Sequence, residues 1–129
     1  MRLVTIAALL LASYPALAAP SLLGQWRIVA IAGVEKVDMA RTRADFAENG
    51  RYASTIGCNR IAGKAIVSSD RLSFGPMMTT RMACPDPLDR VERAYLAALQ
   101  AVRGYRFEGG KLALVGEDGA ALVTLVRLR

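Results

Sequence analysis

The sequence predicts a single α+β domain, made of an antiparallel β-sheet and one α-helix. Four short turn signals separate segments in which apolar and polar residues alternate, the pattern of β-hairpins with one buried face. One other segment repeats apolar residues every three or four positions, as an amphipathic helix does. The length of 129 residues fits one domain and leaves little room for a second.

Residues 1–18 have the features of a secretory signal peptide. A positively charged start precedes the apolar run from Leu3 to Ser13, and Pro15 and small residues follow it. The run is shorter than the ~20 apolar residues that span a bilayer, although a buried N-terminal helix is the alternative. We expect cleavage after Ala18, which leaves residues 19–129 as the mature domain. No cysteine for lipidation lies near this site, and no later segment is apolar enough to cross a membrane.

The first strand is expected from Gln25 to Ala32, around the only tryptophan, Trp26. A domain with so few aromatic residues needs the area that a tryptophan buries. We therefore expect Trp26 to be buried near the rim of the core, with its indole N–H bonded to a backbone carbonyl. The alternative is an exposed recognition residue, since tryptophan is enriched at binding hot spots.

Two hairpins are expected in the middle of the chain. Asn49-Gly50 favours a type I′ turn, because both residues tolerate positive φ. Counting outward from it places Glu48 opposite Arg51, and Phe46 opposite Ala53. The second hairpin turns near Ser69-Asp70 and places four side chains on one face: Ala65, Val67, Leu72 and Phe74.

The C-terminal third predicts an antiparallel meander with two tight turns, Gly109-Gly110 and Asp118-Gly119. Each turn independently assigns Leu112 and Leu114 to one face. A shift of one residue in either register would break this agreement. The face they share also holds Tyr105, Phe107, Val123 and Leu125.

One helix lies between the two β regions. Asp86 is a plausible N-cap, Pro87 suits the first helical position, and Gly104 ends the helix. The expected buried stripe consists of Leu88, Val91, Tyr95, Ala98, Leu99 and Val102. The expected water-facing residues are Asp89, Arg90, Glu92, Arg93 and Gln100.

The two cysteines, Cys58 and Cys84, would meet an oxidising compartment after export, where disulfides persist. We expect an intramolecular structural disulfide between them. The alternative is a redox-active pair, but such pairs usually have the Cys-x-x-Cys spacing, which is absent here.

Little in the sequence suggests catalysis. The absence of His excludes histidine-based triads and metal sites, and two cysteines cannot form a four-cysteine zinc site. No serine lies in a recognisable Ser-Lys motif, and the acidic residues are scattered along the sequence. The remaining possibility for catalysis is a pair of carboxylates that the fold brings together. We therefore expect a protein that is not an enzyme, with no cofactor, no metal ligands and no catalytic residues.

Positive charge is spread along the chain. Lys and Arg total 17 against 11 Asp and Glu, which gives a net charge of +6. The arginines are not interleaved with aromatic residues as on a nucleic-acid-binding face. We expect a solvated surface of a monomer, or weak contact with an anionic envelope surface, and no nucleic-acid partner.

Two motifs in a fixed order carry a family resemblance. A Gly-Cys-Asn segment precedes a Thr-x-Met-x-Cys segment, and a helix and two short strands of the form Tyr-x-Phe-x-Gly-Gly-x-Leu-x-Leu follow. Over residues 21–128 the chain resembles the META/HslJ domain family. Cys58 and Cys84 match the positions of the cysteines of that family. The matching motif residues are Gly57, Cys58, Asn59, Gly63, Thr80, Met82 and Cys84.

The resemblance implies a strongly curved, half-barrel-like antiparallel sheet packed by one helix. It also implies an envelope or secreted protein linked to heat shock, antibiotic tolerance, motility or virulence, with no established catalysis. Some relatives are lipid-anchored, whereas this chain lacks the cysteine for it.

The leading hypothesis is a non-catalytic, exported envelope protein that acts as a stress-related binding or assembly module for an unidentified envelope partner. The alternatives are a secreted hydrolase inhibitor and a carrier of an apolar ligand within the curved sheet. Inhibition of a hydrolase would need an exposed loop. The alternative interpretation of the candidate segment is a connection that its methionines pack against the domain. The candidate interaction loop contains Gly75, Pro76, Met77, Met78 and Arg81.

Overall fold

A computed structural model describes residues 2–5, 7–12 and 21–128, and confirms the single α+β domain with one α-helix. The expected cleavage site after Ala18 lies outside the described residues. The helix among them is too short to span a membrane. The elements are β1 (Gly24–Ile31), a 3₁₀ turn (Met39–Arg41), β2 (Arg43–Phe46), β3 (Arg51–Thr55), β4 (Arg60–Ser68), β5 (Arg71–Phe74), β6 (Met78–Thr79), α1 (Leu88–Ala101), β7 (Gly104–Glu108), β8 (Lys111–Val115) and β9 (Ala121–Arg127).

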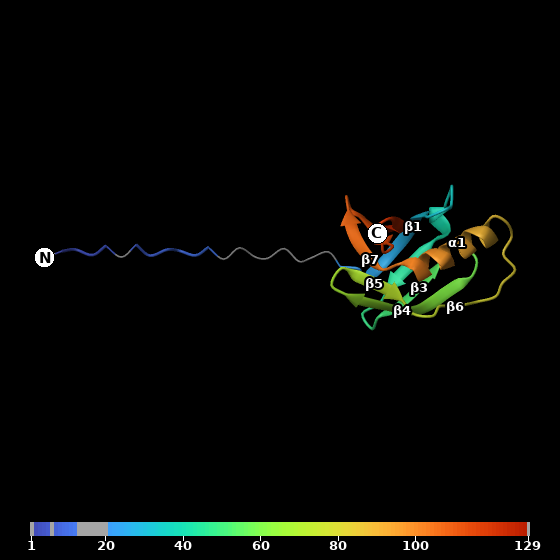
Figure 1. Ribbon diagram of the computed structural model, residues 1–129, viewed down its shortest axis with the longest axis horizontal. Helices are drawn as coiled ribbons and strands as arrows, with labels where there is room; N and C mark the ends of the chain where they lie inside the picture. Colours follow the sequence, from blue (N-terminus) through green and yellow to red (C-terminus); the bar gives the residue numbers. More distant parts are fainter. Residues whose placement is uncertain (1, 6, 13–20, 129) are drawn as a thin grey trace.

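The sheet is antiparallel and curves into a ring (Figure 1). Its nine strands follow the order β3-β2-β1-β9-β8-β7-β5-β4-β6, and β3 also pairs with β4. This extra pairing closes the ring, so the expected curvature is confirmed and goes further than a half-barrel. Because the ring is closed, strands that would otherwise lie at an edge of the sheet gain a hydrogen-bonding partner. Among the residues described, the short strand β6 pairs only with β4, and a long connection leads from it to the start of α1 (Figure 1).

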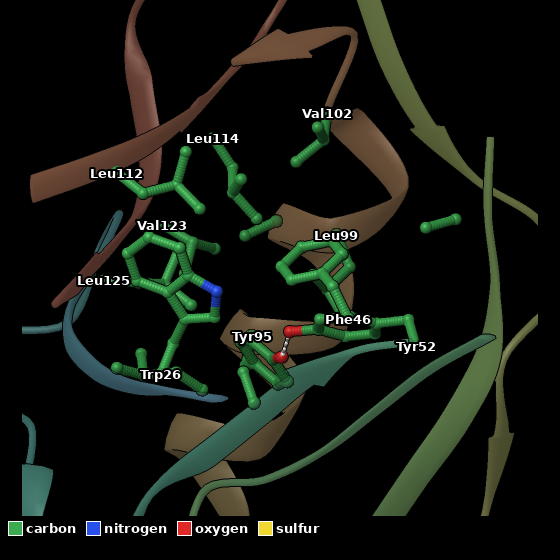
Figure 2. Packing of buried hydrophobic residues seen from close by; sticks show 14 of the residues in the cluster. Trp26, Phe46, Tyr52, Tyr95, Leu99, Val102, Leu112, Leu114, Val123 and Leu125 are labelled. Carbon is green, nitrogen blue, oxygen red and sulfur yellow. Dashed lines mark hydrogen bonds between the residues drawn. The ribbon is translucent and has the colours of Figure 1, made fainter. Parts of the chain in front are cut away.

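The interior of the ring is filled by side chains of the sheet and the helix (Figure 2). Tyr95, Leu99 and Val102 bring the helix into this core, where they meet side chains of the strands. Trp26 is 2% exposed, and its indole N–H donates to the carbonyl of Leu22 at 2.9 Å, which confirms both expectations for this residue. Because the interior is occupied, the structure argues against an apolar ligand carried inside the curved sheet.

The registers of the C-terminal meander are confirmed. Leu112 pairs with Phe107 on one side and with Leu125 on the other. Gly109 and Gly110 both have positive φ, 52° and 79°, as a type I′ turn requires. Two turns thus agree with the registers of three consecutive strands.

The expected register of the first hairpin is wrong by one residue. Phe46 pairs with Tyr52 rather than with Ala53. The turn has three residues between Ala47 and Arg51, and only its last residue, Gly50, has positive φ. The observed register buries Tyr52 completely and brings its ring within 4.8 Å of the Phe46 ring. A two-residue turn would have put Ala53 in that place, so burial of an aromatic ring outweighs the preferred turn.

The second hairpin has the expected register, with Ala65 opposite Phe74 and Val67 opposite Leu72. Val67 is nevertheless 48% exposed, so the shared face is only partly buried at this end of the strand pair.

The helix differs from the expectation at its start and on one face. It begins at Leu88, and Asp86 is not its N-cap: the Asp86 carboxylate lies 3.7 Å from the Arg90 guanidinium. The helix ends at Ala101, and Gly104 opens β7. The larger difference concerns Glu92, which was expected to face water but is only 8% exposed.

Candidate functional site

The two family motifs meet at one end of the ring. Cys58 lies in the connection between β3 and β4, and Cys84 lies in the connection between β6 and α1. Their sulfur atoms form a disulfide across a Cα–Cα distance of 6.0 Å, which confirms the expected bridge. The bridge joins the β3–β4 connection to the approach of the helix, over 26 residues of sequence.

Asn59 is the centre of a polar network in this region. Its side-chain oxygen accepts hydrogen bonds from the Thr80 hydroxyl at 3.0 Å and the Met82 backbone N–H at 2.8 Å. Its side-chain NH₂ donates to the Glu92 carboxylate at 2.7 Å and contacts the Cys84 sulfur at 3.3 Å. One buried amide therefore links the β3–β4 connection, the segment after β6, and the helix.

Glu92 is the carboxylate of this network. Besides the Asn59 side chain, the Asn59 backbone N–H donates to it at 3.2 Å. No cation forms an ion pair with Glu92 among the residues that the structure describes. A buried carboxylate needs such donors, because burial without them carries a large free-energy penalty.

The sequence itself carries a signal for the burial of Glu92. Glu92 lies four residues after Leu88 and three before Tyr95, which places it on the apolar stripe of the helix. A charged residue on such a stripe indicates a buried polar contact.

The two motif glycines make room for close contacts. Gly57 has a φ of +119°, and a Cβ there would lie 3.1 Å from the Cβ of Arg41. A Cβ on Gly63 would lie 2.6 Å from the Met77 sulfur and 2.9 Å from the Pro76 carbonyl oxygen. Gly63 thus allows the segment before β6 to lie directly on β4.

The candidate interaction loop lies flat on the sheet rather than projecting from it. The Gly75 N–H donates to the Lys64 carbonyl at 2.9 Å, and Met78 of β6 pairs with Ala62 of β4. Met77 packs partly buried against the core, whereas Met78 is 79% and Met82 63% exposed. Pro76, Thr80 and Arg81 are exposed as well.

A surface hollow of about 600 Å³ lies between this segment and the helix. Its lining includes the buried Asn59 and Glu92, together with Thr80, Arg81 and Met82. The structure therefore brings the motif residues and part of the interaction loop together, with Glu92 as a member that the sequence prediction missed.

A second buried polar group lies inside the core. The hydroxyl groups of Tyr52 and Tyr95 are hydrogen-bonded to each other, and Tyr95 also donates to Ser54 at 2.8 Å (Figure 2 shows the tyrosine contact). Burial raises the pKa of Tyr52 to about 12, and raises that of Tyr95 well above 10.0. Both phenols therefore stay protonated at neutral pH, and they serve the packing of the core.

The described residues contain no group of three His, Cys, Asp or Glu side chains placed to hold a metal ion. The polar atoms of the motif bind one another, and the surface around them carries exposed methionine and arginine side chains. This arrangement combines a rigid base with an exposed segment.

The sequence profile of the META domain matches residues 20–127, the whole of the described ring. The chain belongs to the META domain family. Both motifs that carried the resemblance, including Asn59 and the two cysteines, lie within the matched range.

Solved structures share the fold of this META domain. An NMR structure of a protein from Burkholderia xenovorans has a TM-score of 0.62 and 24% identity, and covers 89% of this chain and 95% of its own. A second NMR structure of a protein has a TM-score of 0.61 and 19% identity, with 79% and 86% covered. A crystal structure of a DUF4847 family protein from Bacteroides vulgatus has a TM-score of 0.55 and 13% identity, with 70% and 61% covered. Curated proteins give no match to this chain.

Proposed function

We propose that this META domain is an exported, non-catalytic binding module that presents the segment from Pro76 to Ala83 to a partner in the cell envelope. One observation carries the proposal: the buried polar atoms of the family motif bind one another and hold this segment, while its outer side chains are exposed. The Asn59 side chain binds two points of the segment, at Thr80 and Met82, and the Arg60 backbone also binds Thr80. Exposed methionines suit a binding surface, since their side chains adapt to different partners.

Two features support export. The disulfide between Cys58 and Cys84 suits an oxidising compartment. The composition of residues 1–18 is that of a secretory signal peptide. The test is to express the full chain in a bacterial host, to fractionate the cells and to determine the N-terminus of the periplasmic form by mass spectrometry. We expect a mature protein that begins at Ala19, and an uncleaved cytoplasmic protein would contradict export.

The alternative of a hydrolase inhibitor is less well supported by the shape of the segment. An inhibitory loop must project into the active site of its target, whereas Met78 and Thr79 pair with β4 and lie along the sheet. A panel of proteases and lysozymes tests this alternative, and we expect no inhibition at micromolar concentration.

Site-specific crosslinking tests the binding surface itself. A photoreactive side chain is placed at Met82, which is 63% exposed, or at Ile66, which is 53% exposed on β4 outside the segment. In living cells of the natural host, we expect one defined crosslinked product from position 82 and none from position 66. Equal crosslinking from both positions would contradict the proposal, because it would indicate nonspecific contact.

A further inference from the structure

The arginines of residues 21–128 fall into two groups. Eight of them bind a carboxylate or a backbone carbonyl of the protein itself: Arg27, Arg41, Arg71, Arg90, Arg93, Arg103, Arg106 and Arg127. Within residues 21–128 the side chains of the other four have no such partner: Arg43, Arg51, Arg60 and Arg81. Three of these four line a single hollow of about 510 Å³ on the outside of the ring: Arg43, Arg51 and Arg60. Most of the guanidinium groups that bind no carboxylate or carbonyl of the protein therefore lie at this one hollow.

The strand registers arrange the outer face at this hollow in three rows. The first row contains Arg43 of β2, Thr55 of β3 and Arg60 of β4. The middle row contains Asp45, Ala53 and Ala62, and Met78 of β6 extends it. The third row contains Arg51 of β3 and Lys64 of β4, directly opposite each other. Side chains on one face of a strand repeat every ~6.8 Å, so this distance separates successive rows.

The third row destabilises the sheet. Like charges directly opposite each other on neighbouring strands repel, and Arg51 and Lys64 form such a pair. Asp45, in the middle row, is the only carboxylate among the residues that line the hollow. Residues that lower the stability of a fold without a structural gain are expected at functional sites. A bound anion beside Arg51 and Lys64 would relieve this repulsion.

We propose that this hollow binds an extended acidic segment of another protein, in which one apolar residue lies between two acidic residues in the order acid-x-apolar-x-acid. Alternate side chains of an extended segment also repeat every ~6.8 Å, which matches the three rows. One acidic side chain would meet Arg43 and Arg60, and the other would meet Arg51 beside Lys64. Arginine suits this role because its planar guanidinium binds a carboxylate with two parallel hydrogen bonds.

The middle row explains why the central residue is apolar. Ala53 and Ala62 leave space for a larger side chain, and the exposed Met78 offers an apolar wall beside it. The carboxylate of Asp45 in the same row would repel an acidic residue at this position. A lipid head group has its negative charge at one end, so it would meet one cationic row and leave the other unused. The site extends the proposed binding function to a neighbouring face and does not depend on export.

The test uses a blocked, fluorescently labelled peptide, Gly-Glu-Ser-Leu-Ser-Glu-Gly, and the scrambled peptide Gly-Glu-Glu-Leu-Ser-Ser-Gly, which has the same composition and charge. Binding to the oxidised domain is measured by fluorescence anisotropy, and the position by NMR chemical-shift changes. We expect the first peptide to bind more tightly and to shift the signals of Ala53 and Ala62. R43Q, R60Q and R51Q should each weaken its affinity by up to about fivefold, as expected for exposed ion pairs.

R93Q is the matched control, since Arg93 is an exposed arginine of the helix that binds Asp89 and lies outside the hollow. It should leave the affinity unchanged. R51Q separates a binding role from a structural one, because removal of the repulsion from Lys64 should raise the melting temperature while the affinity falls. Equal affinity of the two peptides, or no effect of R43Q, R60Q and R51Q, would overturn the proposal. Binding of vesicles of anionic phospholipid with the same arginine dependence, in the absence of peptide binding, would also overturn it and would assign the hollow to a membrane surface.

Discussion

The C-terminal strands β7, β8 and β9 and the region around Asn59 are held in place by different kinds of interaction. Two short turns set the strand registers of the first region, and the residues they align, such as Leu112 and Leu114, are fully buried. In the second region, a disulfide and the hydrogen bonds of one asparagine hold segments that are far apart in sequence. The first region depends on local turns and apolar burial, and the second on a few specific long-range contacts. A single substitution should therefore loosen the second region locally, whereas damage to the first should affect the whole domain.

The largest effect is expected from Trp26→Ala, in the core beside the C-terminal strands. Trp26 is 2% exposed and its ring lies 6.5 Å from that of Phe107. Removal of a buried large aromatic side chain usually costs about 3–5 kcal/mol of folding free energy. Chemical denaturation should show this loss, with a smaller loss for Trp26→Phe. If Trp26→Ala melts at the temperature of the parent protein, the core assignment is wrong.

The double substitution Cys58→Ser and Cys84→Ser should lower the free energy of unfolding by about 3.5 kcal/mol, because the bridge restricts a long loop of the unfolded chain. Because the bridge holds only the region around Asn59, its loss should loosen that region first. Limited proteolysis of the double variant should cut first within residues 75–87, and strands β7–β9 should stay intact. Cleavage that starts in the C-terminal strands would contradict it.

Asn59→Ala should lower the free energy of unfolding by about 3 kcal/mol, because the buried Glu92 carboxylate loses the shorter of its two donors, the Asn59 side chain, and keeps only the backbone N–H. The matched variant is Asn59→Ala combined with Glu92→Ala, which removes the unpaired charge. Thermal denaturation should show that the second substitution recovers part of the loss. A double variant whose loss equals the sum of the two single losses would indicate that Asn59 and Glu92 do not interact.

These two regions also differ in how far the sequence predicts them. The glycine turns and the alternation of apolar residues predicted the registers of β7, β8 and β9, because both signals are local. The register of the first hairpin could not be read from its turn, since burial of Tyr52 against Phe46 outweighs the preference of Asn49-Gly50. The motif residues marked the site, and the apolar stripe of the helix indicates that Glu92 is buried, but no local pattern identifies its partner Asn59, 33 residues away.

A smaller effect is expected at alkaline pH. Burial raises the pKa of Tyr52 from 10.0 to about 12, so the native state keeps a proton that the unfolded state releases above pH 10. The contribution is complete below pH 10 and is lost as the pH rises from 10 to 12, by about 2 kcal/mol. Urea denaturation across this range should show a decrease that is shallower in Tyr52→Phe. An equal decrease in the two proteins would contradict the assignment.

The central claim is that Asn59 holds the segment after β6 in place without controlling the rest of the ring. NMR order parameters of the backbone N–H groups test it most directly, in the parent domain and in Asn59→Ala. Thr80 keeps its two hydrogen bonds with the Arg60 backbone in the variant. The account therefore predicts that residues 81–83 fall from the rigid range near 0.85 to below about 0.6, while β8 stays near 0.85. Unchanged order parameters for residues 81–83, or an equal decrease in β8, would contradict it.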